Sequence, residues 1–291
     1  MELSLDRLTK QYGRKIAVDC VSATLKPGVY GLLGANGAGK TTLMRMLCAV
    51  LESTSGEVLL DGKEVTSMGA DYRNVLGYLP QDFGYYPNYT AVEFLMYIAA
   101  LKGIPKNVAK KRVTELLEVV DLSHVANKKV KTFSGGMKQR VGIAQALLIN
   151  PYILILVEPT AGLDPKERVR FRNLLSEYAG DKIVILSTHI VSDIEAIADE
   201  VLLMKKGKFV LQGTVPELIH KANGKVWELS VSPQEARQWQ TKTTVANLRH
   251  EGKEIILRII SDNMPSERAV PCEATLEDLY LFYFPTEEGV K

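Results

Sequence analysis

The chain has 291 residues, 46% of them hydrophobic, and its 36 basic and 34 acidic residues leave a net charge of +2. This length accommodates one large domain and a small one, and the balanced charge without a basic run argues against nucleic acid as a partner. No apolar segment approaches the ~20 residues that span a bilayer and the N-terminus lacks signal-peptide character, so we expect a cytoplasmic protein whose cysteines (Cys20, Cys48 and Cys272) are reduced core residues.

The first third of the chain predicts short strands on both sides of a glycine-rich loop. Strands are expected at residues 3–8, 16–25 and 29–33, and after the loop and its helix at 57–60, 63–65 and 73–79. Helical patterning begins at Thr90, where Thr90 and Glu93 match a capping box. Helices are expected at about 91–102, 107–120 and 134–149, and together they would form a helical insert at about 88–148.

The rest of the chain predicts an α/β arrangement followed by a different kind of segment. Continuous apolar runs at 153–157, 183–187 and 201–204 alternate with helices at about 166–179 and 191–198, which is typical of a largely parallel, buried sheet. After Gly213 a short helix at 216–220 precedes strands at 226–232, 243–249 and 254–260 and helices at 233–240 and 275–284. We therefore expect residues 221–291 to form a small α+β appendix.

The strongest motif is the loop at residues 30–42, in which Gly34, Gly39, Lys40 and Thr41 match the phosphate-binding pattern G-x-x-x-x-G-K-[ST]. Glycines allow the backbone to curl so that its N–H groups point at phosphate oxygens. Lys40 can reach the β- and γ-phosphates, the Thr41 hydroxyl can ligate Mg²⁺, and the following helix adds its N-terminal dipole. The alternative is a strand-to-helix turn that binds nothing, but the strand–loop–helix context favours a nucleoside triphosphate.

A second anion site is predicted at Ser134, Gly135 and Gly136, immediately before another helix. Two such half-sites in one chain suggest a nucleotide held between two copies. With both motifs, residues 1 to about 215 resemble the ATP-binding subunit of ATP-binding cassette transporters, in particular bacterial exporter ATPases for drugs and lantibiotics. Those relatives carry a C-terminal appendix with a segment similar to residues 274–280. The resemblance implies a P-loop NTPase core with an antiparallel β subdomain and the helical insert, in an ATP-binding domain of residues 1–220.

The resemblance also implies roles for individual residues. Tyr12 would stack on adenine, Gln81 would sense Mg²⁺ together with Thr41, and His189 would contact the γ-phosphate. Glu158 follows a buried strand, where a carboxylate can orient or deprotonate the attacking water; Asp164 would communicate across the dimer. The remaining ATP ligands would be Gly34, Asn36, Gly37, Ala38, Gly39, Lys40, Thr41 and Thr42, and on the partner copy Ser134, Gly135 and Gly136.

Val157 departs from the family, which has an aspartate that holds Mg²⁺ through water at this position. The main hypothesis is an ATPase subunit that dimerises around two ATP molecules and drives a separate membrane permease, an exporter, at the inner face of the cell membrane. The Val157 departure keeps a nucleotide-gated regulator with weak turnover as an alternative. A DNA-repair, chromosome-structure or ribosome-acting relative is disfavoured because the chain has one phosphate-binding loop, no CxxC pair and no sustained heptads.

The expected permease contact is the region at residues 81–97, which contains Phe83, Tyr85, Tyr86 and Tyr89. Aromatic residues are enriched at protein interfaces. They could equally form the core of the helical insert, so both interpretations stay open at this point.

Overall fold

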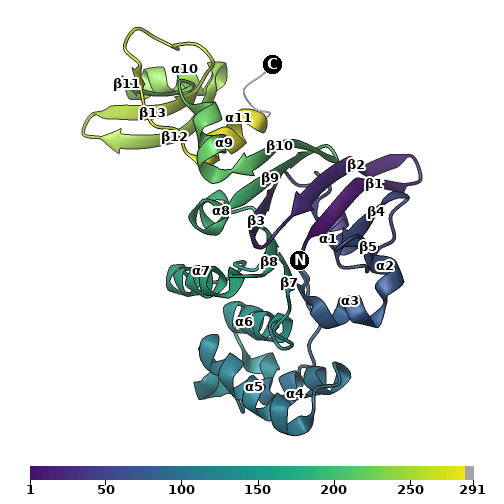
Figure 1. Ribbon diagram of the computed structural model, residues 1–291. Helices are drawn as coiled ribbons and strands as arrows, with labels where there is room; N and C mark the ends of the chain where they lie inside the picture. The colour runs from purple at the N-terminus through teal and green to yellow at the C-terminus, as the bar shows by residue number, and fades with distance from the viewer. Residues whose placement is uncertain (286–291) are drawn as a thin grey trace. The chain divides into compact units, whose positions relative to one another are not determined.

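The computed structural model describes residues 1–285, and they form two compact units (Figure 1). The first unit is Met1–Val210 and the second begins at Leu211. This division lies ten residues before the expected boundary at residues 220 and 221, which falls inside helix α9 (Val215–Ala222). Helix α9 packs against α11 (Leu276–Tyr283), so both helices belong to the second unit. The last six residues of the predicted appendix lie outside the described residues.

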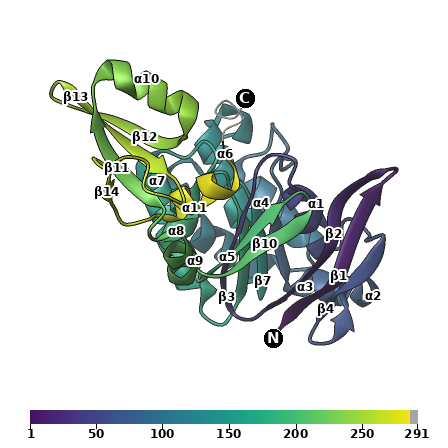
Figure 2. The same cartoon turned by 90° about the horizontal axis from the view of Figure 1, so that it is seen from above.

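The first unit contains two sheets whose strands begin and end close to the predicted runs. The antiparallel sheet has the order β2-β1-β4-β5, with strands β1 (Leu3–Tyr12), β2 (Lys15–Leu25), β4 (Ser55–Leu60) and β5 (Lys63–Glu64). In both Figure 1 and Figure 2 the strands β1, β2 and β4 lie side by side. This sheet is the predicted antiparallel β subdomain.

The six-stranded sheet has the order β10-β9-β3-β8-β7-β6. Its strands are β3 (Gly28–Leu33), β6 (Leu76–Leu79), β7 (Ile153–Val157), β8 (Ile183–Ser187), β9 (Glu200–Lys205) and β10 (Lys208–Thr214). Neighbouring strands from β6 to β9 run parallel, and every residue of β7 and β8 is buried. The parallel order brings the carboxyl ends of β3, β6, β7 and β8 to one edge, where ligands bind in folds of this kind.

Eight α-helices and two short 3-10 helices (Ser123–Val125 and Val130–Thr132) are assigned within residues 1–210. The α-helices are α1 (Lys40–Leu47), α2 (Val65–Met68), α3 (Ala70–Val75), α4 (Ala91–Leu101), α5 (Lys106–Val119), α6 (Gly135–Ala146), α7 (Pro165–Ala179) and α8 (Val191–Ile197). The capping box predicted at Thr90 is present at the start of α4. In the part of the chain that the structure describes, no helix is both long and apolar enough to cross a membrane.

Two predictions about this unit were wrong in detail. Residues 73–75 are helical rather than part of a strand, because Tyr72 is fully buried in α3 and its hydroxyl donates to the Leu47 carbonyl. Cys20 is exposed rather than in the core, since it lies in β2 with φ of 51°, where the pairing with β1 shifts register. Of the other cysteines, Cys48 is buried as expected and Cys272 is half-buried.

The second unit is an α+β structure, as predicted. Its sheet has the order β12-β13-β11-β14, with strands β11 (Val226–Val231), β12 (Thr244–Glu251), β13 (Glu254–Ile260) and β14 (Val270–Pro271). One sheet face packs with α10 (Pro233–Lys242) into a hydrophobic core, and the half-buried Trp227 and Trp239 pack against that core. The buried Asp278 carboxylate of α11 accepts hydrogen bonds from Arg258 Nε at 2.9 Å and Nη2 at 2.6 Å. The predicted helix at 216–220 is longer than expected, since α9 begins at Val215 and ends at Ala222.

Candidate functional site

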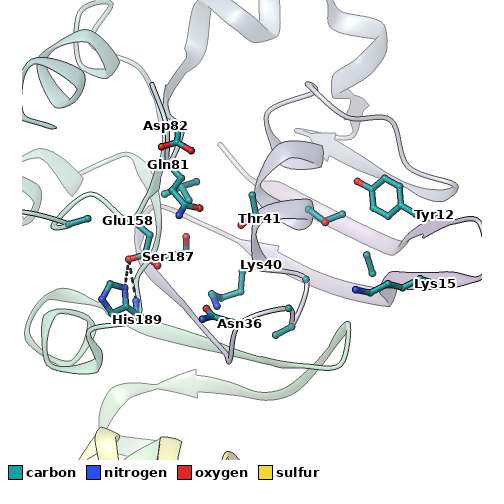
Figure 3. A pocket seen from close by; sticks show the side chains of 17 residues that line it. Tyr12, Lys15, Asn36, Lys40, Thr41, Gln81, Asp82, Glu158, Ser187 and His189 are labelled. Atoms are coloured by element: carbon teal, nitrogen blue, oxygen red, sulfur yellow. Dashed lines mark hydrogen bonds and ion pairs between the residues drawn. The ribbon is translucent and has the colours of Figure 1, made fainter. Parts of the chain in front are cut away.

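A cavity of about 780 Å³ lies at the carboxyl edge of the parallel sheet, beside the glycine-rich loop (Figure 3). Most of the predicted site residues line this cavity. They are Tyr12, Asn36, Gly37, Ala38, Gly39, Lys40, Thr41, Thr42, Gln81, Glu158 and His189. The strand order therefore brings together residues that are up to 177 positions apart, from Tyr12 to His189.

At two positions of the loop between β3 and α1, glycine is the only residue that fits. A Cβ at Gly34 would lie 2.3 Å from the Met204 carbonyl oxygen, and one at Gly39, where φ is 108°, would lie 2.2 Å from the Ala17 carbonyl oxygen. Gly39 precedes α1, and no side chain of the described chain caps that helix. The backbone N–H groups of its first turn are thus available to an anion.

Lys40 spans the mouth of the loop. Its ammonium donates hydrogen bonds to the carbonyl oxygens of Gly34 at 2.5 Å and Ala35 at 3.2 Å. Burial lowers the pKa of Lys40, and the negative charge of Glu158 acts in the opposite direction. Lys40 and Glu158 therefore interact electrostatically, and both line the cavity.

Glu158 follows β7 in a backbone conformation that is uncommon for a residue with a side chain, with φ of 50°. Its carboxylate accepts from the ring Nδ1 of His189 at 2.7 Å and from the His189 backbone N–H at 3.4 Å, as the dashed lines in Figure 3 show. The Glu158 N–H donates to the Ser187 carbonyl at 2.8 Å. These contacts fix a carboxylate at the edge of the sheet, where it can accept a proton from water.

The sequence analysis missed several residues that line the cavity, namely Lys15, Ala17, Asp82, Ala161 and Ser187. Asp82 and Ser187 follow or end the strands β6 and β8, so their strand-end position was a signal that could have found them. Val157, the last residue of β7, also lines the cavity and is 2% exposed.

The donors in the cavity fit a hard divalent cation that is held mostly by its substrate. Thr41 and Gln81 offer a hydroxyl and an amide oxygen, and both line the cavity drawn in Figure 3. Within residues 1–285, no group of three or more His, Cys, Asp or Glu side chains could hold a metal ion. Mg²⁺ typically binds one or two protein oxygens together with substrate phosphates and water, which suits this donor set.

The turn at Ser134, Gly135 and Gly136 lies apart from these residues. Of the described residues that line the cavity, none belongs to this turn. Ser134 caps α6 by accepting from the Met137 N–H at 3.2 Å. A Cβ at Gly135 would meet no atom of residues 1–285 within 4 Å, so the turn presents open backbone to its surroundings. The turn that the sequence analysis predicted to bind an anion is thus separate from the cavity.

The fold and the cavity define a class of protein. A strand, a glycine-rich loop and a helix that carries Lys40 and Thr41, set beside a strand-end carboxylate on a parallel sheet, characterise a P-loop nucleotide-binding ATPase. The helical insert that begins with α4 and the separate turn before α6 distinguish it from a minimal P-loop domain.

Comparisons with known proteins give the family. The model of the family described as ABC transporter matches residues 18–161. The uncharacterized ABC transporter ATP-binding protein YxlF of Bacillus subtilis is 35% identical over 294 residues, which cover 96% of this chain and 98% of the relative. The bacitracin transport ATP-binding protein BcrA of Bacillus licheniformis is 40% identical over 230 residues, which cover 78% of this chain and 74% of the relative.

A solved dimeric structure of a bacterial ABC transporter cassette aligns with a TM-score of 0.68 and 26% identity, over 73% of this chain and 98% of that one. The chain therefore belongs to the ABC transporter family, as an ATP-binding subunit with ATPase activity. The predicted family, fold class and enzyme class are confirmed.

Proposed function

We propose that this chain dimerises around two molecules of Mg²⁺·ATP and drives a separate membrane permease, an exporter. The separation of the two anion-binding features carries the proposal. The cavity holds the loop, Lys40 and Glu158, whereas the turn at Gly135 lies outside it and opens to solvent. A second copy supplying its turn to this chain's cavity would complete both sites at once.

The cavity residues fall into two groups, those that would bind Mg²⁺·ATP and those that would hydrolyse it. The loop N–H groups and Lys40 would hold the phosphates, and Tyr12, which is 46% exposed, would offer its ring to adenine. Thr41 and Gln81 would hold Mg²⁺, which neutralises phosphate charge when bound. Glu158 would orient water and accept its proton, and His189 would keep that carboxylate in place while contacting the γ-phosphate.

Light scattering of the purified chain with and without Mg²⁺·ATP tests the dimer. We expect a monomer without nucleotide and a doubled mass with it. Gly135→Asp should abolish the dimer while sparing ATP affinity, because nothing in the described chain contacts that Cβ and the added carboxylate would face the γ-phosphate of the partner's ATP. An ATP-bound dimer of this variant with wild-type affinity would refute the arrangement.

The region predicted to contact the permease contains both core and surface aromatics. Phe83 packs on Phe94 and Tyr85, with ring centroids 6.4 Å and 5.8 Å apart, so it packs against the insert. Tyr86 and Tyr89 are 47% and 37% exposed and their ring centroids are 5.0 Å apart. A groove of about 720 Å³ continues from Tyr89 along α4 and α5, lined also by Met96, Tyr97, Ala100 and Ile104.

We assign the permease contact to this groove, and it would bring the chain to the inner face of the membrane. The relative named for bacitracin transport supports an exporter of antimicrobial compounds. Tyr89→Cys, in a chain whose exposed Cys20 is replaced by serine, should cross-link to the co-expressed permease, and Val169→Cys on α7, 46% exposed at the native valine, should not. Equal cross-linking at both positions would contradict the assignment.

No contact in the structure favours the regulator hypothesis that Val157 prompts. It stays a prediction, and the Val157→Asp experiment in the Discussion decides it.

A further inference from the structure

The backbone of Glu158 is held by a contact from the helix that begins at the second anion-binding feature. A residue with a side chain adopts a φ of 50° only when its surroundings determine it, because this conformation is intrinsically unfavourable. The Glu158 carbonyl accepts from the Ala161 N–H at 3.2 Å and from the Gln139 side-chain Nε2 at 3.0 Å. Gln139 is only 9% exposed, so this hydrogen bond is shielded from water.

Gln139 differs from the other groups that fix Glu158. Ser187 and His189 lie at the end of β8 and just beyond it, and Ala161 lies three residues after Glu158 in the same segment. Gln139 lies in α6 (Gly135–Ala146), the helix that Ser134 caps. It therefore joins the backbone carbonyl of Glu158 to the helix that begins at the signature turn, which we define as Ser134–Gly136.

A second set of contacts holds α6 against the segment after Glu158. Arg140 Nη2 lies 2.7 Å from Glu167 Oε1, and the side chain of Glu167 accepts from the Asp164 N–H at 3.3 Å in the cap of α7. The signature turn approaches the same segment, since a Cβ at Gly136 would lie 2.9 Å from the Gly162 carbonyl oxygen. The turn, α6 and residues 158–167 are thus fixed to one another over a short distance.

We propose that Gln139 is a positioning residue that couples the signature turn to the hydrolytic carboxylate of Glu158. The inference rests on the proposed function, in which the signature turn contacts the partner's ATP and Glu158 serves this chain's own ATP. Docking of the turn on the partner's nucleotide fixes α6, and Gln139 then fixes the Glu158 peptide. Each nucleotide in the dimer would in this way prepare the other for hydrolysis.

The test compares Gln139→Met with Gln145→Met in the full chain. Both substitutions remove an amide from the same helix and keep an unbranched side chain. Gln145 is the matched control because its Oε1 has no hydrogen-bond partner within residues 1–285 and its side chain lines a different cavity. We expect Gln139→Met to lower kcat about tenfold, the size of one hydrogen bond, with KM within twofold of wild type. Gln145→Met should keep the wild-type kcat.

A double-mutant cycle with Ser134→Ala distinguishes coupling from an independent role. If the signature turn acts on Glu158 through Gln139, the double variant should be as slow as the slower single variant. Effects on kcat that multiply would overturn the coupling, and so would a Gln139→Met variant that dimerises with ATP and keeps the wild-type kcat. A wild-type chain that hydrolyses ATP without dimerising would instead refute the proposed function.

Discussion

The substitution Val157→Asp distinguishes the contribution of residue 157 to the stability of the fold from its contribution to Mg²⁺ binding. Val157 ends β7, is 2% exposed and belongs to the hydrophobic cluster that includes residues of α1. Burial of a valine side chain stabilises a fold by about 1.5–3 kcal/mol, and a buried carboxylate without a partner adds a desolvation cost. Lys40 offers little compensation, because its ammonium already donates to the Gly34 and Ala35 carbonyls.

We therefore expect the nucleotide-free variant to be less stable by about 2–4 kcal/mol. For a unit of this size, 1 kcal/mol corresponds to ~2–4 °C, so Tm should fall by ~4–16 °C. With Mg²⁺·ATP bound, we expect Val157→Asp to raise rather than lower the stability of the protein. The carboxylate would then accept hydrogen bonds from the waters of the cation. A group that holds metal-bound water typically changes metal affinity or activity ~10–100-fold. The variant should hydrolyse ATP faster than wild type, most visibly at limiting Mg²⁺.

Calorimetry with and without Mg²⁺·ATP, together with ATPase rates across a Mg²⁺ titration, measures both effects. Val157→Ala is the control, because it loses apolar burial without gaining an acid and should lower Tm with no gain in rate. Identical rates and Mg²⁺ midpoints for wild type and Val157→Asp would refute the reasoning. Val157 would then be a silent variation and the regulator hypothesis would be dropped.

Three further predictions concern the signature turn and the second unit. Gly136→Ala should destabilise the first unit by about 1–3 kcal/mol in thermal unfolding, because its Cβ would press on the Gly162 carbonyl, while Gly135→Ala should be neutral. A chain that ends at Gly213 should keep its ATP affinity within a few-fold in a fluorescent-nucleotide titration, since every residue lining the cavity precedes residue 190. Arg258→Met should destabilise the second unit by about 3 kcal/mol at neutral pH in urea, because it leaves the Asp278 carboxylate buried without its cation.

The Arg258 variant also has an expected pH dependence. Burial acts to raise the pKa of Asp278, but hydrogen bonds from Arg258 and Thr275 hold that pKa below its usual value. The native pair therefore stabilises the fold above the unfolded pKa of about 3.9, and this contribution is lost as pH falls through the lower folded pKa. Without Arg258, burial should raise the pKa of Asp278 above its unfolded value, so the destabilisation of Arg258→Met relative to wild type should be largest at neutral pH and should shrink as the pH falls through the raised pKa. A difference in unfolding free energy that stays constant from neutral to acid pH would contradict this account.

Each of the other two predictions has a clear contrary result. Equal thermal stability of Gly136→Ala and Gly135→Ala would show that the segment around Gly162 moves to accommodate the added Cβ without any loss of stability. Loss of nucleotide binding by the folded, shortened chain would show that the second unit contributes to the site.

The sequence predicted the elements whose signals are local. The apolar runs of β7 and β8 were placed to the residue, because a strand buried on both faces leaves an uninterrupted pattern. The phosphate-binding loop was found because its glycines and Lys40 lie within one short stretch, Gly34–Lys40. Contacts between residues far apart in the sequence produce no such local pattern. The helix at residues 73–75 depends on the hydrogen bond from Tyr72 to Leu47, and Gln139 reaches Glu158 across 19 positions.

The same limit applies to the boundary between the two units. The expected division near residue 220 followed a change in local pattern, but α9 is stabilised by α11, which lies more than fifty positions later. Asp82 and Ser187 were missed for a similar reason, since only the strand order shows that β6, β7 and β8 end beside the loop.

The two tryptophans of the chain, Trp227 and Trp239, are half-buried and both pack against the core of the second unit. Light at 295 nm excites tryptophan almost selectively, so the nucleotide-binding unit is optically silent in such an experiment while the appendix is not. If the tryptophan emission changes when ATP enters the cavity, the change would therefore show that ATP binding alters the second unit. The native chain thus carries its own reporter of whether its two units communicate, without any attached dye.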